Sequence, residues 1–431
     1  MGMKYTNTLD FAKGLDDKDP LKKFRKKFLF PKHGGKEALY FTGNSLGLQP
    51  ASVSKYINIE LEDWAKYAVE GHFDARNPWY SYHEMFAAPT AKLMGAKPDE
   101  VVVMNQLTVN LHLMMVSFYR PDKKRYKIIC ESNAFPSDQY ALQTHVQSHG
   151  LDPREVLIEI GPRKGENLVR FEDIEKAIRD NGNELALVII GGVNYLTGQV
   201  LNMPAITKAA HKVGAYAAFD LAHAAGNIEV KLHDWDVDFA VWCTYKYLNS
   251  GPGAVAGAFI HERHIKNQKL IRFAGWWGYD KKTRFQMNHD FEPMKTAEGW
   301  QLSNAPVFSM AAHKASLDIF TEAGGMKPLC KKSKMLTGYL EFIIGGLNEK
   351  IKDKKVRLEI ITPKDEDQRG CQLSIIAHGM GRDFYETLTK NGVFCDWRNP
   401  NVVRLAPVPL YNSFEDVWRF GQTVEKVLKL K

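Results

Sequence analysis

Short apolar runs alternate with amphipathic segments between residues 125 and 260, and this alternation limits the possible folds more than any other feature of the chain. Apolar runs of roughly four to eight residues, bounded by glycine or polar residues, are typical of buried strands. Helical patterns separate the runs, and one has Pro204 in its first turn and Gly214 at its end. The predicted strands are RYKIICES, ELALVIIGGVNY, AYAAFD, VDFAVWC and AVAGAFI, and the predicted helices are DQYALQTHVQSHG and MPAITKAAHKVG. The alternation predicts an α/β fold with a mostly parallel sheet covered by helices on both faces, which binds ligands at the carboxyl ends of its strands.

The last third of the chain has a different pattern. Its predicted strands are VRLEIITP, GCQLSIIAHG and NVVRLAP, and its predicted helices are RDFYETLTKNG and SFEDVWRFGQTVEKVLKL. The last helix is expected to begin with a capping box formed by Ser413 and Asp416. We therefore expect a large ligand-binding domain over residues 51–310 and a smaller α+β domain over residues 311–431, with an N-terminal segment, 1–50, that packs with the small domain.

Composition excludes several classes of function. The net charge of +8, from 58 basic and 50 acidic residues, is mild for 431 residues, and no nucleic-acid-binding motif accompanies it. No apolar run approaches the roughly 20 residues of a membrane span, and the N-terminus has no apolar signal segment, so we expect a cytoplasmic protein without a membrane partner. Five scattered cysteines form no C-x-x-C pair. We therefore expect neither a disulfide framework nor a zinc site, and no bound metal.

The densest basic stretch is LKKFRKKFLF, residues 21–30. Leu21, Phe24 and Phe28 fall at helical spacing between lysines and Arg25. An amphipathic helix that binds a membrane or RNA would have this pattern. A docked helix with a solvated basic face has it too, and we expect that arrangement here.

A lysine follows one of the predicted buried strands directly. In VDFAVWCTYKYLNSGPG, residues 237–253, Lys246 stands between two tyrosines and before a glycine-rich turn. Most lysines at strand ends are solvated. Here the glycines would let a ligand approach the backbone, and a desolvated lysine can act as a nucleophile or base. Covalent attachment of pyridoxal phosphate (PLP) is the best-known use of such a lysine.

PLP makes further demands that this sequence meets. Its pyridine nitrogen needs a carboxylate, and Asp220 ends the strand AYAAFD, with His223 three residues later. Its phosphate needs donors, which the start of a helix near Thr108 would supply. Its ring needs an apolar face, which Phe135 would supply beside Asp138. Each feature alone has an ordinary structural explanation. Their order along the chain is specific to PLP enzymes with the aspartate-aminotransferase fold, which is PLP fold type I.

The sequence also resembles the kynureninase family over nearly its whole length. The most specific stretches are GNSLGLQP, CTYKYLN and RLAPVPLYNS, and further matches include AFPSDQYA, FDLAHAAGN, GWWG and LSNAPVFS. The resemblance implies hydrolysis of L-kynurenine or 3-hydroxy-L-kynurenine to L-alanine and anthranilate or 3-hydroxyanthranilate. That reaction belongs to tryptophan catabolism and to the supply of precursors for NAD synthesis, and the sequence does not distinguish the two roles.

The resemblance assigns roles to individual residues. Lys246 would hold PLP and move the α-proton, and Tyr245 would contact the phosphate and assist proton transfer. Arg404 would clamp the substrate α-carboxylate, although an arginine on an edge strand would otherwise be expected to be solvated. The remaining cofactor contacts implied by the family are Leu107, Thr108, Phe135, Pro136, Ser137, Asp138, Asp220 and His223.

The resemblance also implies a homodimer with shared active sites. A tryptophan and an asparagine would come from the partner subunit, and they match Trp276 and Asn304, with Trp277 as the other candidate for the tryptophan. Ser45, His72 and Ser303 would lie near the substrate ring. Members of the family that prefer 3-hydroxykynurenine resemble this chain at EGHF and LSNAP, so we expect that preference here.

Two alternatives remain open. A cysteine desulfurase or selenocysteine lyase would need a thiolate on a mobile loop, and Cys395 is the only candidate for it. A PLP-binding transcriptional regulator would need an N-terminal helix-turn-helix domain. The roughly 40 residues before YFTGNSLG are too few for such a domain and a linker.

Overall fold

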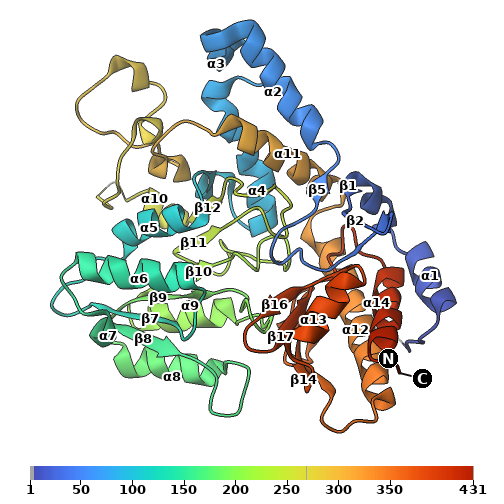
Figure 1. The fold of residues 1–431 in the computed structure, drawn as a ribbon. Helices are drawn as coiled ribbons and strands as arrows, with labels where there is room; N and C mark the ends of the chain where they lie inside the picture. The colour runs from blue at the N-terminus through green and yellow to red at the C-terminus, as the bar shows by residue number, and fades with distance from the viewer. Residues whose placement is uncertain (1–3, 268, 431) are drawn as a thin grey trace.

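The computed structural model describes residues 4–267 and 269–430. Its main element is a seven-stranded sheet with the strand order β6-β12-β11-β10-β9-β7-β8 (Figure 1). The strands are β6 (Val101–Val103), β7 (Lys127–Glu131), β8 (Leu157–Ile160), β9 (Leu185–Gly191), β10 (Tyr216–Asp220), β11 (Phe239–Trp242) and β12 (Gly257–Ile260). Only β12 runs against its neighbours. The predicted α/β fold with a mostly parallel sheet is confirmed.

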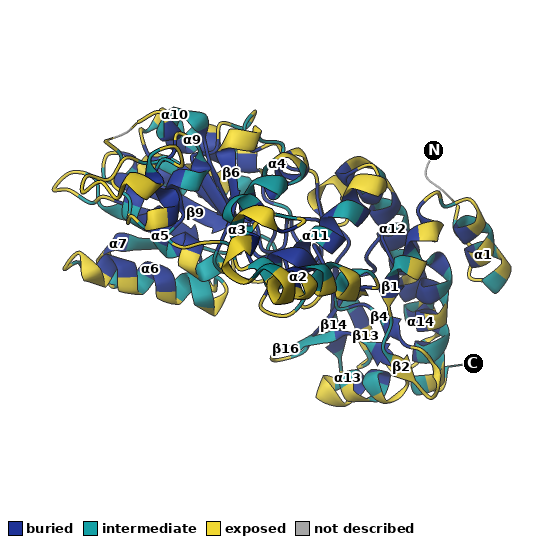
Figure 2. Ribbon diagram, turned by 90° about the horizontal axis from the view of Figure 1, so that it is seen from above, coloured by how far each residue is buried: buried dark blue, intermediate teal, exposed yellow. Residues whose placement is uncertain are grey.

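Helices cover both faces of this sheet because successive strand residues point to opposite sides. On one face Ile128, Cys130 and Ile189 pack with α5 (Leu107–Phe118), α6 (Pro136–Ser148) and α7 (Pro153–Val156). On the other face Ile129 and Val188 pack with α8 (Phe171–Asn181) and α9 (Met203–Lys212). Figure 2 shows the strands as buried and the outer sides of the helices as exposed.

A four-stranded antiparallel sheet with the order β13-β14-β17-β16 follows in the last third of the chain. Its strands are β13 (Arg357–Ile360), β14 (Leu373–His378), β16 (Asp396–Arg398) and β17 (Val402–Leu405), and its helices are α12 (Met326–Lys350), α13 (Gly381–Lys390) and α14 (Phe414–Val427). The predicted capping box is present at the start of α14, where Ser413 and Asp416 each accept the other's backbone N–H. β17 is an inner strand, so the expectation that it lies at an edge is wrong.

The N-terminal residues pack against this second unit. The carboxylate of Asp16, in α1 (Leu9–Asp17), accepts hydrogen bonds from the Phe414 and Glu415 amides at 2.8 and 3.0 Å. The short strands β4 (Leu39–Tyr40) and β15 (Val393–Phe394) pair in parallel. The domain boundaries expected near residues 50 and 310 stay predictions.

The basic stretch forms a 3-10 helix over Lys22–Lys27 instead of an α-helix. Leu21, Phe24 and Phe28 are buried as expected. A spacing of three or four residues fits both kinds of helix, so the apolar pattern fixes the buried side but not the helix type. The strand β1 (Phe28–Leu29) ends the basic stretch by pairing with β5 (Gln49–Pro50).

The other elements join or flank the two sheets. They are β2 (Lys32–His33), β3 (Lys36–Glu37), α2 (Val53–Tyr67), α3 (Gly71–Asp74), α4 (Ala87–Met94), α10 (Glu262–Ile265) and α11 (Val307–Glu322). Across the described part of the chain, every helix is too short or too polar to cross a lipid bilayer.

Candidate active site

A cavity lies at the carboxyl edge of the large sheet, as predicted for this fold. β7 ends there at Glu131, β9 at Gly191 and β10 at Asp220, and Lys246 reaches it from the loop after β11. The residues that line the cavity are Leu107, Thr108, Glu131, Ala134, Phe135, Ser137, Asp138, Gly191, Val193, Tyr195, Asp220, Ala222, His223, Tyr245 and Lys246. Nine of the predicted site residues thus meet in one place, although they are spread over some 140 positions of the sequence.

The loop that carries Lys246 is held against the GNSLG segment. The Gly47 amide donates a hydrogen bond to the Tyr245 carbonyl at 2.8 Å. A Cβ atom on Gly47 would lie 2.3 Å from the Lys246 carbonyl oxygen, so only glycine fits there. The turn at Gly47 therefore helps to position Lys246, although the two residues are about 200 positions apart in the sequence.

The Lys246 amine points into the cavity. Its Nζ lies 3.1 Å from Nε2 of His223 and 5.8 Å from the centre of the Phe135 ring. Burial, and secondarily the nearby Lys246 charge, holds the pKa of His223 well below its usual range. The imidazole is therefore neutral and can accept a hydrogen bond from the amine. Phe135 is 41% exposed and presents its ring to the cavity.

Three carboxyl groups line the same cavity, those of Glu131, Asp138 and Asp220. Asp220 is buried and accepts a hydrogen bond from the Ala222 amide at 2.6 Å. Burial raises the pKa of Asp220 and that of Glu131. Burial and the adjacent Asp220 charge raise the pKa of Asp138 well above its usual range. The raised pKa values show that these carboxyl groups lack a positive partner, so a cationic hydrogen-bond donor would be stabilised beside them.

These residues fit the predicted PLP cofactor. Oδ1 of Asp138 and Nδ1 of His223 are buried polar atoms without a hydrogen-bond partner in the described residues. A protonated pyridine nitrogen and the ring substituents of PLP carry the donors and acceptors that such atoms lack. The first turn of α5, with Leu107 and Thr108, borders the same cavity and offers backbone amides to a phosphate.

Sequence reasoning missed one connection in this site. Glu131 accepts a hydrogen bond from the Asn194 side-chain amide at 2.5 Å. Oδ1 of Asn194 in turn accepts the Leu196 and Thr197 amides and so fixes the loop that carries Tyr195. The sequence did contain a signal for this bond, because a glutamate at the end of a buried strand is rarely buried without a hydrogen-bond partner.

Arg404 is fully buried on β17 and faces this loop. Its Nη1 donates to the Tyr195 carbonyl at 2.6 Å, and its Nη2 donates to Asp396. Its Nε has no partner in the described residues. Burial lowers the pKa of Arg404 despite the attraction of Asp396. The arginine is therefore a positioned group and not the solvated one expected for an edge strand, but it does not itself line the cavity around Lys246.

The residues expected from a partner subunit lie apart from Lys246 in this single chain. They border a separate cavity of about 380 Å³ lined by Val69, His72, Phe73, Tyr80, Trp276, Trp277, Phe285, Leu302, Ser303 and Asn304. Trp276 is 44% exposed, whereas Trp277 is buried. Ser45 and Pro136 are exposed and line neither cavity.

The thiol considered for desulfurase chemistry is poorly placed. Cys395 is buried between β15 and β16, and burial raises its pKa to about 12. It is neither a thiolate nor on an exposed loop, so the structure disfavours this alternative.

Cavity size alone would point elsewhere. A larger cavity of about 680 Å³ borders Phe171, Met203 and Trp235 and contains none of the predicted residues. The convergence of titratable groups, and not volume, identifies the site at Lys246.

The chain is similar to known proteins over nearly its full length. It is 56% identical over 424 residues to a kynureninase of Flavobacterium psychrophilum, which covers 98% of this chain and 99% of that protein. It is 52% identical over 424 residues to a kynureninase of Christiangramia forsetii, with coverage of 98% and 99%. A family model described as the kynureninase C-terminal domain matches residues 329–424.

Solved structures share the fold at low sequence identity. The apo structure of a cysteine desulfurase from Thermococcus onnurineus NA1 matches with a TM-score of 0.76 at 19% identity and covers 95% of this chain and 98% of that chain. A C-DES mutant with glycine covalently linked to its PLP cofactor matches with a TM-score of 0.70 at 14% identity, with coverage of 89% and 96%. At this level of identity the likeness establishes PLP fold type I and nothing about the reaction.

Proposed function

The chain belongs to the kynureninase family, and we propose that it prefers 3-hydroxy-L-kynurenine to L-kynurenine as its substrate. Its reaction is the PLP-dependent hydrolysis of the β,γ carbon–carbon bond, which yields L-alanine and an anthranilate. Sequence identity above one half over 98% of the chain is the observation that carries this assignment. Product analysis with the purified protein tests it.

PLP, when bound, supplies an electron sink that stabilises negative charge on the substrate carbons. Lys246 would hold the cofactor, and Asp220 with Asp138 would keep its pyridine nitrogen protonated. Phe135 would lie against the ring, and the amides at Leu107 and Thr108 would bind the phosphate. Borohydride reduction followed by peptide mapping tests the first role, because the pyridoxyl group should remain on Lys246 and on no other lysine.

The side chains around Lys246 would then divide the proton transfers. The Lys246 amine would take and return the α-proton, and neutral His223, 3.1 Å away, would orient that amine. Burial raises the pKa of Tyr245, so its hydroxyl stays protonated and serves as a donor. Arg404, fixed by Tyr195 and Asp396, would hold the substrate carboxylate and so present the α-carbon to Lys246.

An obligate homodimer would complete the site. Val69, Phe73, Trp276 and Phe285 are large apolar residues that are between 44% and 70% exposed and border one cavity. An apolar patch of this kind supports contact with a second protein surface. Asn304, exposed at the rim, would then reach the cofactor of the partner subunit.

The preference for 3-hydroxykynurenine rests on the polar groups of this cavity. His72, Ser303 and Asn304 are partly or fully exposed there. Groups that bond the 3-hydroxyl lose a partner when it is absent, and an unmade buried hydrogen bond costs about 1–3 kcal/mol. The expected preference is therefore roughly tenfold to a hundredfold.

The ratio of kcat/KM for the two substrates tests this preference. The double variant His72→Trp, Asn304→Thr should reduce the ratio of kcat/KM for 3-hydroxykynurenine to kcat/KM for kynurenine. His33→Trp, at an exposed histidine outside the cavity, should leave this ratio unchanged. A wild-type protein that favours kynurenine would refute the preference but not the family reaction.

We also propose a cytoplasmic location and a role in tryptophan catabolism or in the supply of precursors for NAD synthesis. Cell fractionation tests the location. Growth of a deletion strain on tryptophan, compared with growth without NAD precursors, separates the two metabolic roles.

A further inference from the structure

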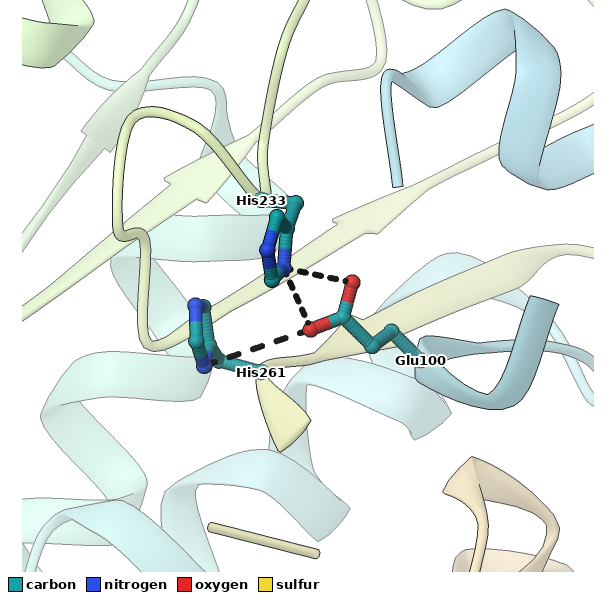
Figure 3. Close-up of side chains that lie close together, drawn as sticks. All are labelled: Glu100, His233 and His261. Atoms are coloured by element: carbon teal, nitrogen blue, oxygen red, sulfur yellow. Dashed lines mark hydrogen bonds and ion pairs between the residues drawn. The ribbon is translucent and has the colours of Figure 1, made fainter. Parts of the chain in front are cut away.

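A second cluster of titratable side chains lies at the edge of the large sheet opposite Lys246. Glu100 ends the 3-10 helix Pro98–Glu100, His233 lies in the loop before β11, and His261 follows β12 (Figure 3). Phe239 at the start of β11 pairs with Ile260 at the end of β12, whereas Lys246 follows the other end of β11. The cluster is therefore separated from the active site by the length of the strands.

The three side chains present ligand atoms to one point. Nδ1 of His233 lies 2.9 Å from Oε1 of Glu100, and Nδ1 of His261 lies 4.0 Å from the same oxygen. All three ligand atoms lie within 4.8 Å of one another. The two imidazole rings are nearly parallel, with centres 4.9 Å apart, so both nitrogens face the carboxylate from the same side.

The charge at this point is not balanced by a permanent cation. Glu100 is completely buried, and its carboxylate accepts the Lys97 and Glu262 amides at 2.9 Å each. The Lys97 amine pairs with Glu262 instead. Within residues 4–267 and 269–430, only histidines form ion pairs with Glu100. A buried carboxylate needs a positive partner. The two imidazoles can provide one only if they are protonated or if they bind a cation together with the carboxylate.

The surroundings orient His261 as a ligand. Its Nε2 lies 3.4 Å from Oδ1 of Asp236, and its Nδ1 accepts the Arg263 amide at a long 3.3 Å. These contacts favour the tautomer with the proton on Nε2 and a lone pair on Nδ1. Histidine ligands of metals commonly donate their other ring nitrogen to a carboxylate in this way. The side chain of His233 is 27% exposed, which leaves an approach for solvent.

We propose that Glu100, His233 and His261 bind a divalent transition-metal ion, with Zn²⁺ as the preferred test ion and water as the fourth ligand. Tetrahedral zinc places its nitrogen and oxygen ligands roughly 3.3 Å apart, so small side-chain shifts and release of the Arg263 amide complete the site. The metal would tie the end of β12 to the loop of His233 and to the start of β6, and would act on stability and not on catalysis.

A second histidine–carboxylate cluster provides an internal comparison. His83, Glu84 and Glu298 also lie close together. There Lys281, a permanent cation, already pairs with Glu84 at 2.9 Å, so this cluster has a positive partner without a metal.

Zinc binding by the untagged, PLP-loaded protein tests the proposal. After dialysis against EDTA, equilibrium dialysis with zinc chloride should give one tightly bound zinc per chain and a higher Tm. His233→Ala and His261→Ala should weaken binding at least about 100-fold, and Asp236→Asn about tenfold. His289→Ala, at an exposed histidine outside the cluster, should bind like wild type.

A measurement on the wild-type protein tests the proposal even if the variants fail to fold. Anomalous diffraction at the zinc edge should place the ion between Glu100, His233 and His261. No bound zinc, zinc that is unaffected by the cluster variants, or zinc located at His83 would overturn the proposal.

Discussion

Replacement of Arg404 by lysine separates the proposed carboxylate clamp from a purely structural charge. The guanidinium makes two fixed contacts, to the Tyr195 carbonyl at 2.6 Å and to Asp396. A lysine keeps the charge but has a single donor head, so it cannot hold these contacts and a carboxylate in one plane. A lost hydrogen bond to a charged group costs about 1.5–3 kcal/mol, which corresponds to about tenfold to 150-fold in kcat/KM.

The loss should appear mainly in KM. A group that holds the carboxylate before and during the reaction contributes equally to the ground state and the transition state. Steady-state kinetics with 3-hydroxykynurenine, at saturating PLP, measures both constants, and Tm reports any damage to the fold. Deaminated substrate, which still carries the carboxylate, should bind wild type more tightly than the variant by a similar factor.

Arg398→Lys is the matched control. Arg398 also pairs with Asp396, at 3.2 Å, but its side chain is 34% exposed on β16. We expect less than a threefold change there, because exposed ion pairs contribute little. Equal losses in the two variants, or an unchanged KM in Arg404→Lys, would refute the clamp.

Three further predictions follow from the site and the core. Asp220→Ala should reduce kcat/KM about 100-fold to 1000-fold with little change in Tm, because it removes a carboxylate that would keep the pyridine nitrogen of PLP protonated. A normal PLP spectrum with full turnover would contradict this. Mixed dimers of Lys246→Ala and Asn304→Ala subunits should regain activity that neither parent has, and inactive mixed dimers of proven composition would mean that each site comes from one chain. Burial lowers the pKa of His313 to about 3, so the folded state binds fewer protons than the unfolded state. The unfolding free energy should therefore fall as the pH drops below about 6.5, by up to about 1.4 kcal/mol per pH unit. Denaturant titrations at several pH values measure this, and the unfolding free energy of His313→Gln should fall less steeply with decreasing pH.

The central fold and the residues around Lys246 could be predicted from sequence because their signals are local. β10 ends at Asp220 and β11 leads to Lys246, so an apolar run fixes the place of each polar residue that follows it. Parallel pairing of β10 and β11 then brings these two ends to one edge.

Features that depend on contacts between distant segments could not be predicted. The burial of Arg404 follows from the inner position of β17, and strand order is not encoded in the strand's own pattern. The bond between Glu131 and Asn194 and the cluster of Glu100 with His261 join residues more than 60 positions apart. The 3-10 helix at Lys22–Lys27 shares its apolar spacing with an α-helix.

We propose that the hydrolysis of 3-hydroxykynurenine depends on Lys246. Mass spectrometry of a reaction with purified protein, PLP and this substrate measures it directly. We expect one L-alanine and one 3-hydroxyanthranilate for each substrate consumed, and neither product from Lys246→Ala. Unchanged substrate would contradict the proposed reaction, and equal product formation by Lys246→Ala would contradict the role of Lys246.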